Sequence, residues 1–348
     1  MTHSPLTPHH SLPIGHWSLV IGHFLALVLL SQTASAQSSL SATIDAVQPK
    51  LVKIHGAGGL QRLEAYQTGT LISAEGHILT AWSYVLDTPD VAVTLYDGRR
   101  KLATLVGLDP RLEIAILKID ATDLPHFTLA EAIDAAPGTR VLAFSNLYGV
   151  AQGDEQLSVL KGIVAGKIDL AARRGTYQTP YRGSVYVLDA VTNNPGAAGG
   201  ALTDRNGNLI GILGKELKSA VDNTWLNYAL PAKDLASSVV DILAGRMTTR
   251  RDDTVKRPSE HYTPAILGLT MIPDILPKTP PYIDRVAKGS AAADAGLQPD
   301  DLVLFVDGRI VSSIKTLIDE LSFVDRLDEV RLTVQRGQEL VEVDLRAK

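Results

Sequence analysis

Short apolar runs separated by turn signals constrain the fold of this chain most strongly. The runs span residues 69–73, 77–80, 91–95, 101–107, 113–119, 140–144, 185–188, 209–213 and 226–230. Asp97-Gly98 and Asn206-Gly207 each lie between two such runs, where these dipeptides are typical of hairpin turns, the second of type I′. Because many short strands divided by turn signals are typical of all-β domains, we expect a β-barrel or sandwich here.

Two helices are predicted at the ends of this β region. Residues 39–47 place Leu40, Ile44 and Val47 on one helical face, and residues 232–243 form an amphipathic pattern after a proline. The next stretch, 246–264, is polar and basic and is predicted to be an interdomain linker, with a specific anionic contact as the alternative. A compact segment of mixed α and β pattern then occupies residues 265–348.

The N-terminal segment has the pattern of an export signal. An apolar run at 17–30 is broken only by His23 and is followed by small residues that end in Ala34-Ser35-Ala36. This is typical of a signal peptide, residues 1–36, that is cleaved after Ala36, although no Lys or Arg precedes the run. An uncleaved anchor and a start codon assigned too far upstream are the alternatives. We therefore expect an exported protein, periplasmic or in the cell envelope or extracellular, with a first domain at 37–245.

Composition excludes several kinds of chemistry. The chain has no cysteine, so disulfides, thiolate catalysis and cysteine-ligated metals are excluded. Its net charge of −5 implies no nucleic-acid partner. No HExxH or similar cluster predicts a metal site, and no cofactor is expected. The four histidines beyond the signal segment are interpreted as structural: His55, His77, His126 and His261.

Three segments of the β region resemble the active-site motifs of HtrA-type serine proteases, which have the trypsin fold. Residues 194–202 read NPGAAGGAL and resemble the GNSGGP/AL loop, with Ala198 at the position of the reactive serine. Residues 76–85 read GHILTAWSYV and resemble GYILTNxHVV, which puts Ser83 at the position of the catalytic histidine. Residues 107–118 read GLDPRLEIAILK and resemble GxDPxxDLAVLK, which puts Glu113 at the position of the catalytic aspartate. The resemblance implies a mainly β fold with a trypsin-like double β-barrel.

All three triad positions are therefore altered. Acyl transfer by a triad needs a hydroxyl nucleophile, a base that titrates near neutrality and a carboxylate that orients the base. Ala198 removes the nucleophile, Ser83 removes the base, and Glu113 keeps a carboxylate with no imidazole to orient. Triad members act as a unit, so the loss of one removes most of the rate. The chain is predicted not to be an enzyme. A Ser–Lys dyad at Ser83 would need a lysine close to it, and the sequence indicates none.

The glycines of the loop at 194–202 allow two interpretations. Gly196, Gly199 and Gly200 can serve close chain packing and unusual backbone angles. Alternatively, the N–H groups of Gly196 and Ala198 form a vestigial oxyanion hole that still binds a carboxylate or a carbonyl.

The C-terminal segment resembles a PDZ domain of the HtrA kind. Residues 286–297 read VAKGSAAADAGL and resemble VxxGSPAAxAGL, and residues 299–308 read PDDLVLFVDG and resemble PGDVIxxVNG. The resemblance implies an α/β domain that binds a peptide C-terminus as an added β-strand. The candidate peptide-binding residues are Ile266, Leu267, Gly268 and Leu269 in the carboxylate-binding loop and Ile314, Leu317 and Ile318 on the helix that flanks the groove. Alternatively, some of these helix residues face the domain core, and the PDZ domain has a structural or oligomerising role.

The sequence thus predicts an exported HtrA-like pseudoprotease. It would bind polypeptide C-termini or unfolded proteins as a scaffold, chaperone or regulator. Two alternatives stay open: a serine endopeptidase with an unconventional or residual active site, and a non-catalytic partner subunit of active HtrA homologues. The resemblance also implies a homo-oligomer, because HtrA-type proteins commonly form trimers.

Overall fold

The fold is taken from a computed structural model of the chain. It describes residues 1, 39–57, 64–88, 90–174, 177–179, 181, 183–246, 256–275, 279–337 and 339–347. Apart from Met1, the predicted signal peptide lies outside the described residues. Among the residues that are described, none of the helices combines the length and the apolarity needed to cross a bilayer.

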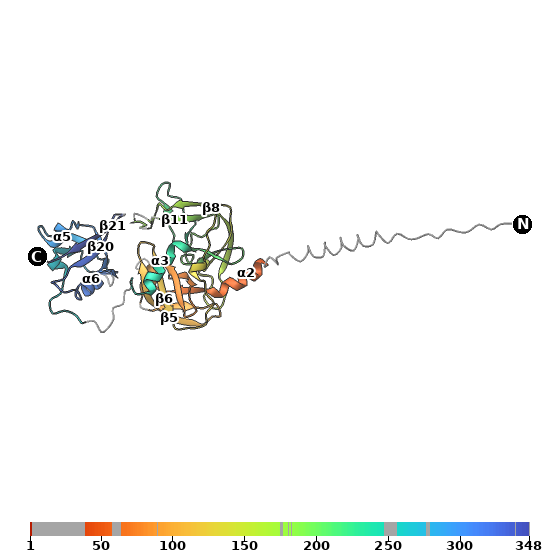
Figure 1. The fold of residues 1–348 in the computed structure, drawn as a ribbon, viewed down its shortest axis with the longest axis horizontal. Helices are drawn as coiled ribbons and strands as arrows, with labels where there is room; N and C mark the ends of the chain where they lie inside the picture. The colour runs from red at the N-terminus through yellow and green to blue at the C-terminus, as the bar shows by residue number, and fades with distance from the viewer. Residues whose placement is uncertain are drawn as a thin grey trace. The chain divides into compact units, whose positions relative to one another are not determined.

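The expected mainly β fold is confirmed, because the first domain contains two closed six-stranded antiparallel barrels, coloured from orange to green in Figure 1. The first barrel has the strand order β1-β2-β3-β6-β5-β4. Its strands are β1 (Leu51–His55), β2 (Tyr66–Leu71), β3 (His77–Ala81), β4 (Val91–Thr94), β5 (Arg100–Asp109) and β6 (Ile114–Ile119). Closure leaves no free sheet edge, so each strand is hydrogen-bonded on both sides.

The second barrel has the strand order β11-β15-β13-β12-β7-β8. Its strands are β7 (Arg140–Ser145), β8 (Ser158–Asp169), β11 (Ser184–Leu188), β12 (Ala201–Asp204), β13 (Leu209–Leu213) and β15 (Tyr228–Pro231). The segments between the strands of this barrel form a separate three-stranded sheet of order β10-β9-β14. Its strands are β9 (Ala172–Arg174), β10 (Tyr177–Gln178) and β14 (Lys218–Ser219). The second barrel supplies the loop at 194–202, which enters β12 directly.

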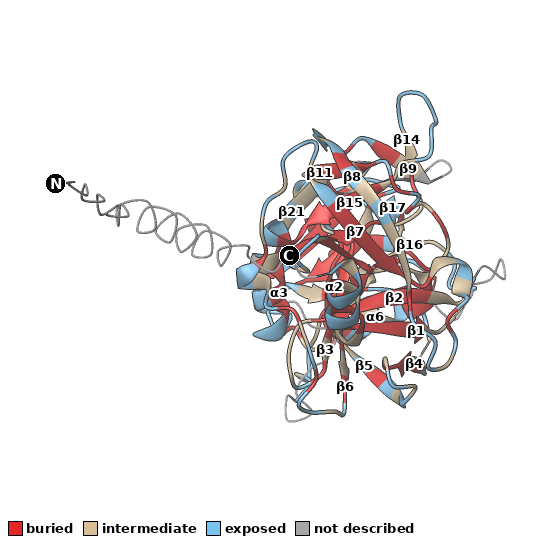
Figure 2. Cartoon of the chain, turned by 90° about the vertical axis from the view of Figure 1, so that its right-hand side faces the viewer, coloured by how far each residue is buried: buried red, intermediate tan, exposed pale blue. Residues whose placement is uncertain are grey.

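Each barrel has its own apolar core, visible as the red strands of Figure 2. In the first barrel the fully buried side chains include Ile54, Ile78, Val93 and Leu117. In the second they include Val141, Tyr186, Ile210 and Ala229. Burial of apolar area at about 25 cal/mol per Å² is the main term that stabilises such cores.

Helix α3 (Ala232–Leu243) matches its predicted range and buries Leu235, Val239 and Ile242. Helix α2 (Leu40–Val47) buries Val47 and Thr43, whose hydroxyl donates to the carbonyl of Arg205 at 3.0 Å. The apolar face predicted for α2 is thus only partly correct.

The type I′ turn predicted at Asn206-Gly207 is wrong. That turn requires positive φ at both residues, whereas only Gly207 (φ 86°) adopts it here. Asp204 accepts hydrogen bonds from the N–H groups of Asn206 and Asn208, so an aspartate-stabilised loop joins β12 to β13 instead.

The C-terminal domain is built from two small sheets and three short helices. The sheets have the orders β16-β17 and β19-β18-β20-β21. The elements are α4 (Pro264–Leu267), β16 (Leu269–Met271), β17 (Ile283–Val286), α5 (Ala291–Asp294), β18 (Leu302–Val306), β19 (Arg309–Ile310), α6 (Ile314–Leu321), β20 (Val330–Arg336) and β21 (Glu339–Leu345). Tyr262 is fully buried in this domain's core, so its packing begins inside the stretch predicted as the linker 246–264.

A buried carboxylate attaches α3 to the end of β5. Asp109 is fully buried, and its carboxylate accepts from the N–H and the guanidinium of Arg111 and, at 2.8 Å, from the hydroxyl of Ser238 in α3. The same aspartate-to-arginine spacing recurs at Asp97 and Arg99, where both side chains are about half exposed. The two motifs therefore differ mainly in the burial of the aspartate, which is complete for Asp109 and partial for Asp97.

Asp109→Asn should lower the free energy of unfolding by about 2–4 kcal/mol, because an amide NH₂ would face donors in a buried site. Asp97→Asn is the matched control and should change it by less than about 1 kcal/mol. Urea unfolding followed by circular dichroism measures both. Equal effects of the two substitutions would contradict the anchoring role of Asp109.

Candidate functional site

The loop at 194–202 keeps the backbone shape that its glycines require. Gly196 and Gly199 both have φ near 90°, at 90° and 83°. A Cβ at Gly196 would lie 2.0 Å from the carbonyl oxygen of Asn146, and one at Gly199 would lie 2.2 Å from that of Thr68. No other residue fits either position without moving backbone, so the first interpretation of these glycines, close chain packing, is confirmed.

Two backbone donors in this loop remain without a partner. The N–H groups of Gly196 and Ala198 have no hydrogen-bond acceptor within the described part of the chain. The carbonyl of Pro195 accepts from the N–H of Tyr148 at 3.1 Å, so the N–H of Gly196, on the opposite side of that trans peptide, points away from Tyr148. Gly196 and Ala198 line a cavity of about 30 Å³.

Ser83 and Glu113 are brought together by the pairing of β3 with β6. Ala81 lies opposite Ile114 in this pairing, and the N–H of Trp82 donates to the carbonyl of Glu113 at 2.8 Å. Ser83 lies two residues after the end of β3, and Glu113 lies just before the start of β6. The backbone pairing thus brings Ser83 and Glu113 to the same end of the first barrel.

The Ser83 hydroxyl has a structural role. It accepts from the N–H of Val85 at 3.1 Å and so caps the 3₁₀ turn Tyr84–Leu86, as serine commonly does. It donates to Gln67 Oε1 at 2.5 Å, and Gln67 in turn donates to Thr80 and to the carbonyl of Ala81. An amide oxygen of this kind cannot take the serine proton as a base.

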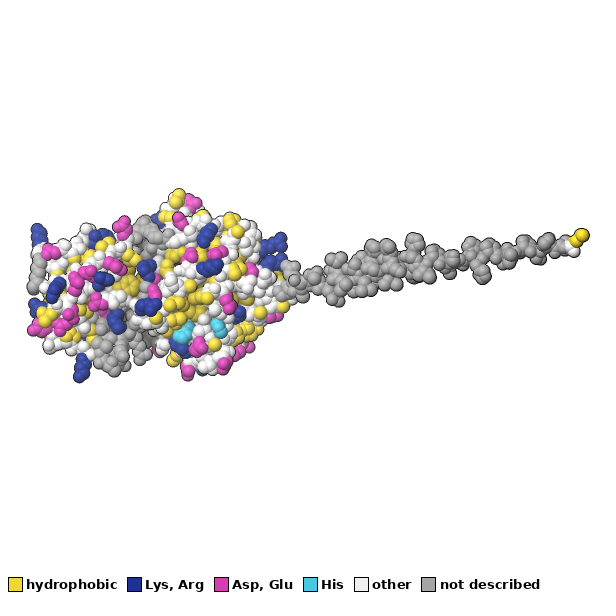
Figure 3. Space-filling model, viewed as in Figure 1, with side chains coloured by type: hydrophobic (Ala, Val, Ile, Leu, Met, Phe, Trp, Pro, Cys, Tyr) yellow, Lys and Arg dark blue, Asp and Glu magenta, His cyan; other side chains and the backbone are white. Residues whose placement is uncertain are grey.

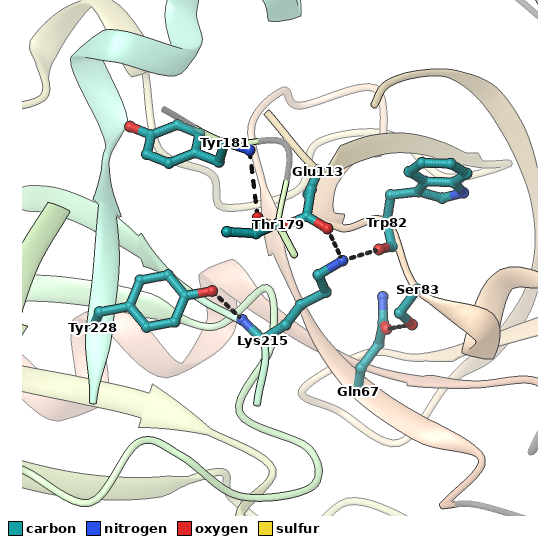
Figure 4. A network of polar contacts seen from close by, with 8 residues as sticks. All are labelled: Gln67, Trp82, Ser83, Glu113, Thr179, Tyr181, Lys215 and Tyr228. Atoms are coloured by element: carbon teal, nitrogen blue, oxygen red, sulfur yellow. Dashed lines mark hydrogen bonds and ion pairs between the residues drawn. The ribbon is translucent and has the colours of Figure 1, made fainter. Parts of the chain in front are cut away.

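Glu113 is held in a strained backbone conformation with its carboxylate buried. Its φ is 55°, a region that costs a non-glycine residue about 1–3 kcal/mol. The side chain is 8% exposed. One carboxylate oxygen, Oε2, accepts from the Thr179 hydroxyl at 2.5 Å, and the other, Oε1, accepts from Lys215 Nζ (Figure 4).

Lys215 is the site residue that the sequence analysis missed. It follows β13, and β13 is bonded to the loop through Leu213, which accepts from Gly199 and donates to Gly200. Besides Glu113, Lys215 Nζ donates to the carbonyl of Trp82 at 3.4 Å (Figure 4). One feature of the sequence could have indicated Lys215: it follows Gly214 directly after the apolar run 209–213, which forms the buried strand β13.

Burial keeps the neighbouring phenol neutral. Tyr228 Oη accepts from the backbone N–H of Lys215 at 3.1 Å, and burial, with the charge of Glu113 as a smaller cause, raises the pKa of Tyr228 well above its usual value. The Glu113 charge is paired with Lys215, and the neutral Tyr228 phenol only accepts from the Lys215 backbone.

None of the histidines in the described part of the chain lines the cavities that contain Ser83, Glu113 or Lys215. The ring of His77 is hydrogen-bonded to Ser73 Oγ at 2.8 Å, and burial, helped by the nearby charge of Lys118, lowers the pKa of His77. His126 bonds the carbonyl of Leu124 at 3.0 Å. Among the described residues no cluster of His, Asp and Glu could hold a metal ion.

The PDZ residues divide into a buried and an exposed set. Leu267, Leu269, Ile314 and Leu317 are buried, with exposed fractions of 0–4%, which is the core-facing alternative that periodicity left open. Ile318 on the same helix is 47% exposed and is available to a ligand.

The predicted carboxylate-binding loop forms a helical turn. Within it the N–H groups of Ile266 and Leu267 donate to the Thr263 hydroxyl and carbonyl, and that of Gly268 donates to the carbonyl of Ala265. A bound peptide carboxylate would have to replace some of these bonds. Strand β16 pairs only with β17 in the described part of the domain, so its other edge carries no neighbouring strand there.

Charges are mixed on the visible surface. On the face drawn in Figure 3, Lys and Arg side chains alternate with Asp and Glu instead of forming a separate basic region. This face offers no extended basic surface of the kind that nucleic-acid backbones require.

Two family models match this chain. Residues 67–212 match the trypsin-like peptidase domain, and residues 265–346 match the PDZ domain. The two matches correspond to the region of the barrels and to the C-terminal domain, in that order along the chain.

Curated relatives and a solved structure agree with these matches. The probable periplasmic serine endoprotease DegP-like of Chlamydia pneumoniae is 27% identical over 278 residues, which cover 79% of this chain and 53% of the relative. The protein of the same name from Halomonas elongata is 31% identical over 280 residues, covering 78% of this chain and 54% of the relative. The chain thus spans about half the length of these curated relatives. A structure of an HtrA-type protease with a tripeptide is similar in fold, with a TM-score of 0.51, 24% identity, and coverage of 89% of this chain and 96% of that one.

These matches support the resemblance that the active-site motifs indicated. The chain matches a trypsin-like peptidase domain followed by a PDZ domain, and over both it is similar to proteins named probable periplasmic serine endoproteases DegP-like.

Proposed function

We propose that this protein is an exported HtrA-like pseudoprotease that binds polypeptides without hydrolysing them. The observation that carries the proposal is the methyl group of Ala198, which stands in the loop where the homologous enzymes need a hydroxyl. A methyl group has no lone pair with which to attack a carbonyl, so the acyl-enzyme of a serine protease cannot form there.

The remaining groups do not replace the missing chemistry. The Ser83 hydroxyl caps a turn and bonds an amide oxygen, so it lacks a base. Lys215 donates to Glu113 and to a carbonyl, and an ammonium has three donors and no acceptor. The free N–H groups of Gly196 and Ala198 support binding of a carbonyl or carboxylate, the second interpretation of the loop, but they do not supply a nucleophile.

Polypeptide binding by the PDZ domain rests on the open edge of β16 and on the exposed Ile318. An added peptide strand would bond the backbone of β16, and an apolar terminal side chain would contact Ile318. Export is supported by the apolar N-terminal pattern that ends at Ala36 and by the homologues named periplasmic endoproteases. A homotrimer, or assembly with active HtrA homologues, belongs to the same proposal; co-purification from the native source tests it.

The purified protein should leave unfolded casein intact and should not react with a fluorophosphonate probe. Ala198→Ser should behave in the same way, because the base is missing as well as the nucleophile. Residual acceleration of about 10³–10⁴-fold over water, from the backbone donors and binding alone, lies below what a gel assay detects. An active serine protease in parallel reactions is the positive control. Cleavage of casein by Ala198→Ser would contradict the proposal.

A second candidate function is a hydrolase that uses Ser83 and Lys215. The observation in its favour is that both residues line the 30 Å³ cavity that also contains the free N–H groups of Gly196 and Ala198. It requires Lys215 to leave Glu113, lose one proton to solvent, and then accept the Ser83 proton as a neutral amine. Fluorophosphonate labelling of the wild type that disappears in Ser83→Ala would establish this candidate in place of the pseudoprotease.

Ile318→Arg should weaken binding of peptides with an apolar C-terminal residue by at least about tenfold, because a charged side chain would line the groove. Leu327→Arg is the matched control, since Leu327 is also apolar and exposed, at 76%, but lies outside α6. Fluorescence anisotropy of labelled peptides from an array screen measures both. Equal affinities of the two variants, or no binding to the wild type, would argue for a structural PDZ domain.

A further inference from the structure

We propose that Lys215 replaces the missing imidazole as the partner of Glu113, and that it thereby keeps the site closed to a general base. This inference rests on the proposed pseudoprotease function and adds a fourth position to the three altered triad residues. Its claim is that the loss of catalysis is maintained by a residue outside the triad.

Both oxygens of the Glu113 carboxylate already accept a hydrogen bond. Lys215 Nζ bonds Oε1 and the Thr179 hydroxyl bonds Oε2, while the side chain as a whole is only 8% exposed. In a working triad the carboxylate instead receives the ring N–H of the base, which fixes the tautomer and the orientation of the ring. An imidazole introduced at position 83 would have to share a carboxylate oxygen with Lys215 or Thr179, or displace one of them.

A buried carboxylate also needs a compensating charge. Thr179 is a neutral donor, and the Ser83 hydroxyl is bonded to Gln67, so neither balances the charge of Glu113. The Lys215 ammonium does so, and at 19% exposure it is itself largely buried. Removal of one member of such a pair leaves an uncompensated charge inside the protein.

The ammonium would oppose any restored base. Lys215 donates to the carbonyl of Trp82, the residue that precedes position 83, so its charge lies close to where an imidazole would stand. A like charge at short range disfavours the imidazolium that a general base must become. Restoring the histidine and the serine alone should therefore give a poor base.

The first experiment compares Ser83→His/Ala198→Ser with the same variant carrying Lys215→Met. Imidazole proton shifts followed by NMR against pH should show a higher pKa of the introduced imidazole, by about one unit or more, when Lys215 is absent. Casein hydrolysis should rise at least about tenfold in the same comparison. Glu216, which lines the 30 Å³ cavity together with Ser83 and Lys215, is unchanged in both variants, so the difference reports the broken Lys215–Glu113 pair.

An unchanged imidazole pKa in these two variants would overturn the inference, whatever their activity. The titration is read from the resonance and does not require a competent enzyme.

The second experiment uses the native background and keeps the test valid if the restored variants fail to fold. Lys215→Met and Glu113→Gln should each lower the melting temperature by roughly 5 °C or more, and the two together should lower it by less than their sum. Lys233→Met is the matched control, because Lys233 pairs with Asp134 at the surface, where the two side chains are 47% and 61% exposed. A Lys215→Met variant that melts like this control would overturn the inference.

The two proposals fail separately. Cleavage by the unmodified protein would remove the pseudoprotease function but would leave the melting data unaffected. An uncoupled Lys215 and Glu113 would remove the inference and leave an inactive, peptide-binding protein.

Discussion

The buried carboxylate of Glu113, at one end of the first barrel, needs a compensating charge, and Lys215 supplies it. The other polar contacts of the site are arranged around this pair. Glu113 enters β6 in a strained conformation that turns its side chain inward. Lys215, which follows β13 of the second barrel, supplies the opposite charge, and Thr179 supplies a further donor. The pair therefore joins a residue at the start of β6 in the first barrel to a residue that follows β13 in the second.

The structure separates the requirements of the fold from those of catalysis. Gly196 and Gly199 are fixed by contacts under 2.5 Å that any side chain would make with neighbouring backbone, so the loop keeps its shape without a nucleophile. Ser83 caps a turn and donates to Gln67. These positions of the motifs therefore have local structural roles of their own.

Much of this could be predicted from the sequence, and the remainder depends on long-range contacts. The period and turn signals predicted most barrel strands, and α3 was predicted to the residue. Strand β8 was missed because its side chains are largely exposed and alternate weakly, and β12 because it begins inside the glycine loop. Lys215 lies 102 positions from Glu113, and no local pattern encodes a contact of that kind. The burial of Leu267 and Leu317 likewise depends on packing between elements.

The central claim is that the site binds polypeptide without acyl transfer. Its most direct test is mass spectrometry of a peptide incubated with the protein in ¹⁸O-labelled water, because a working protease exchanges the oxygens of a terminal carboxylate even when no net cleavage is seen. The account predicts a peptide of unchanged mass. Incorporation of ¹⁸O that disappears in Ser83→Ala would contradict it.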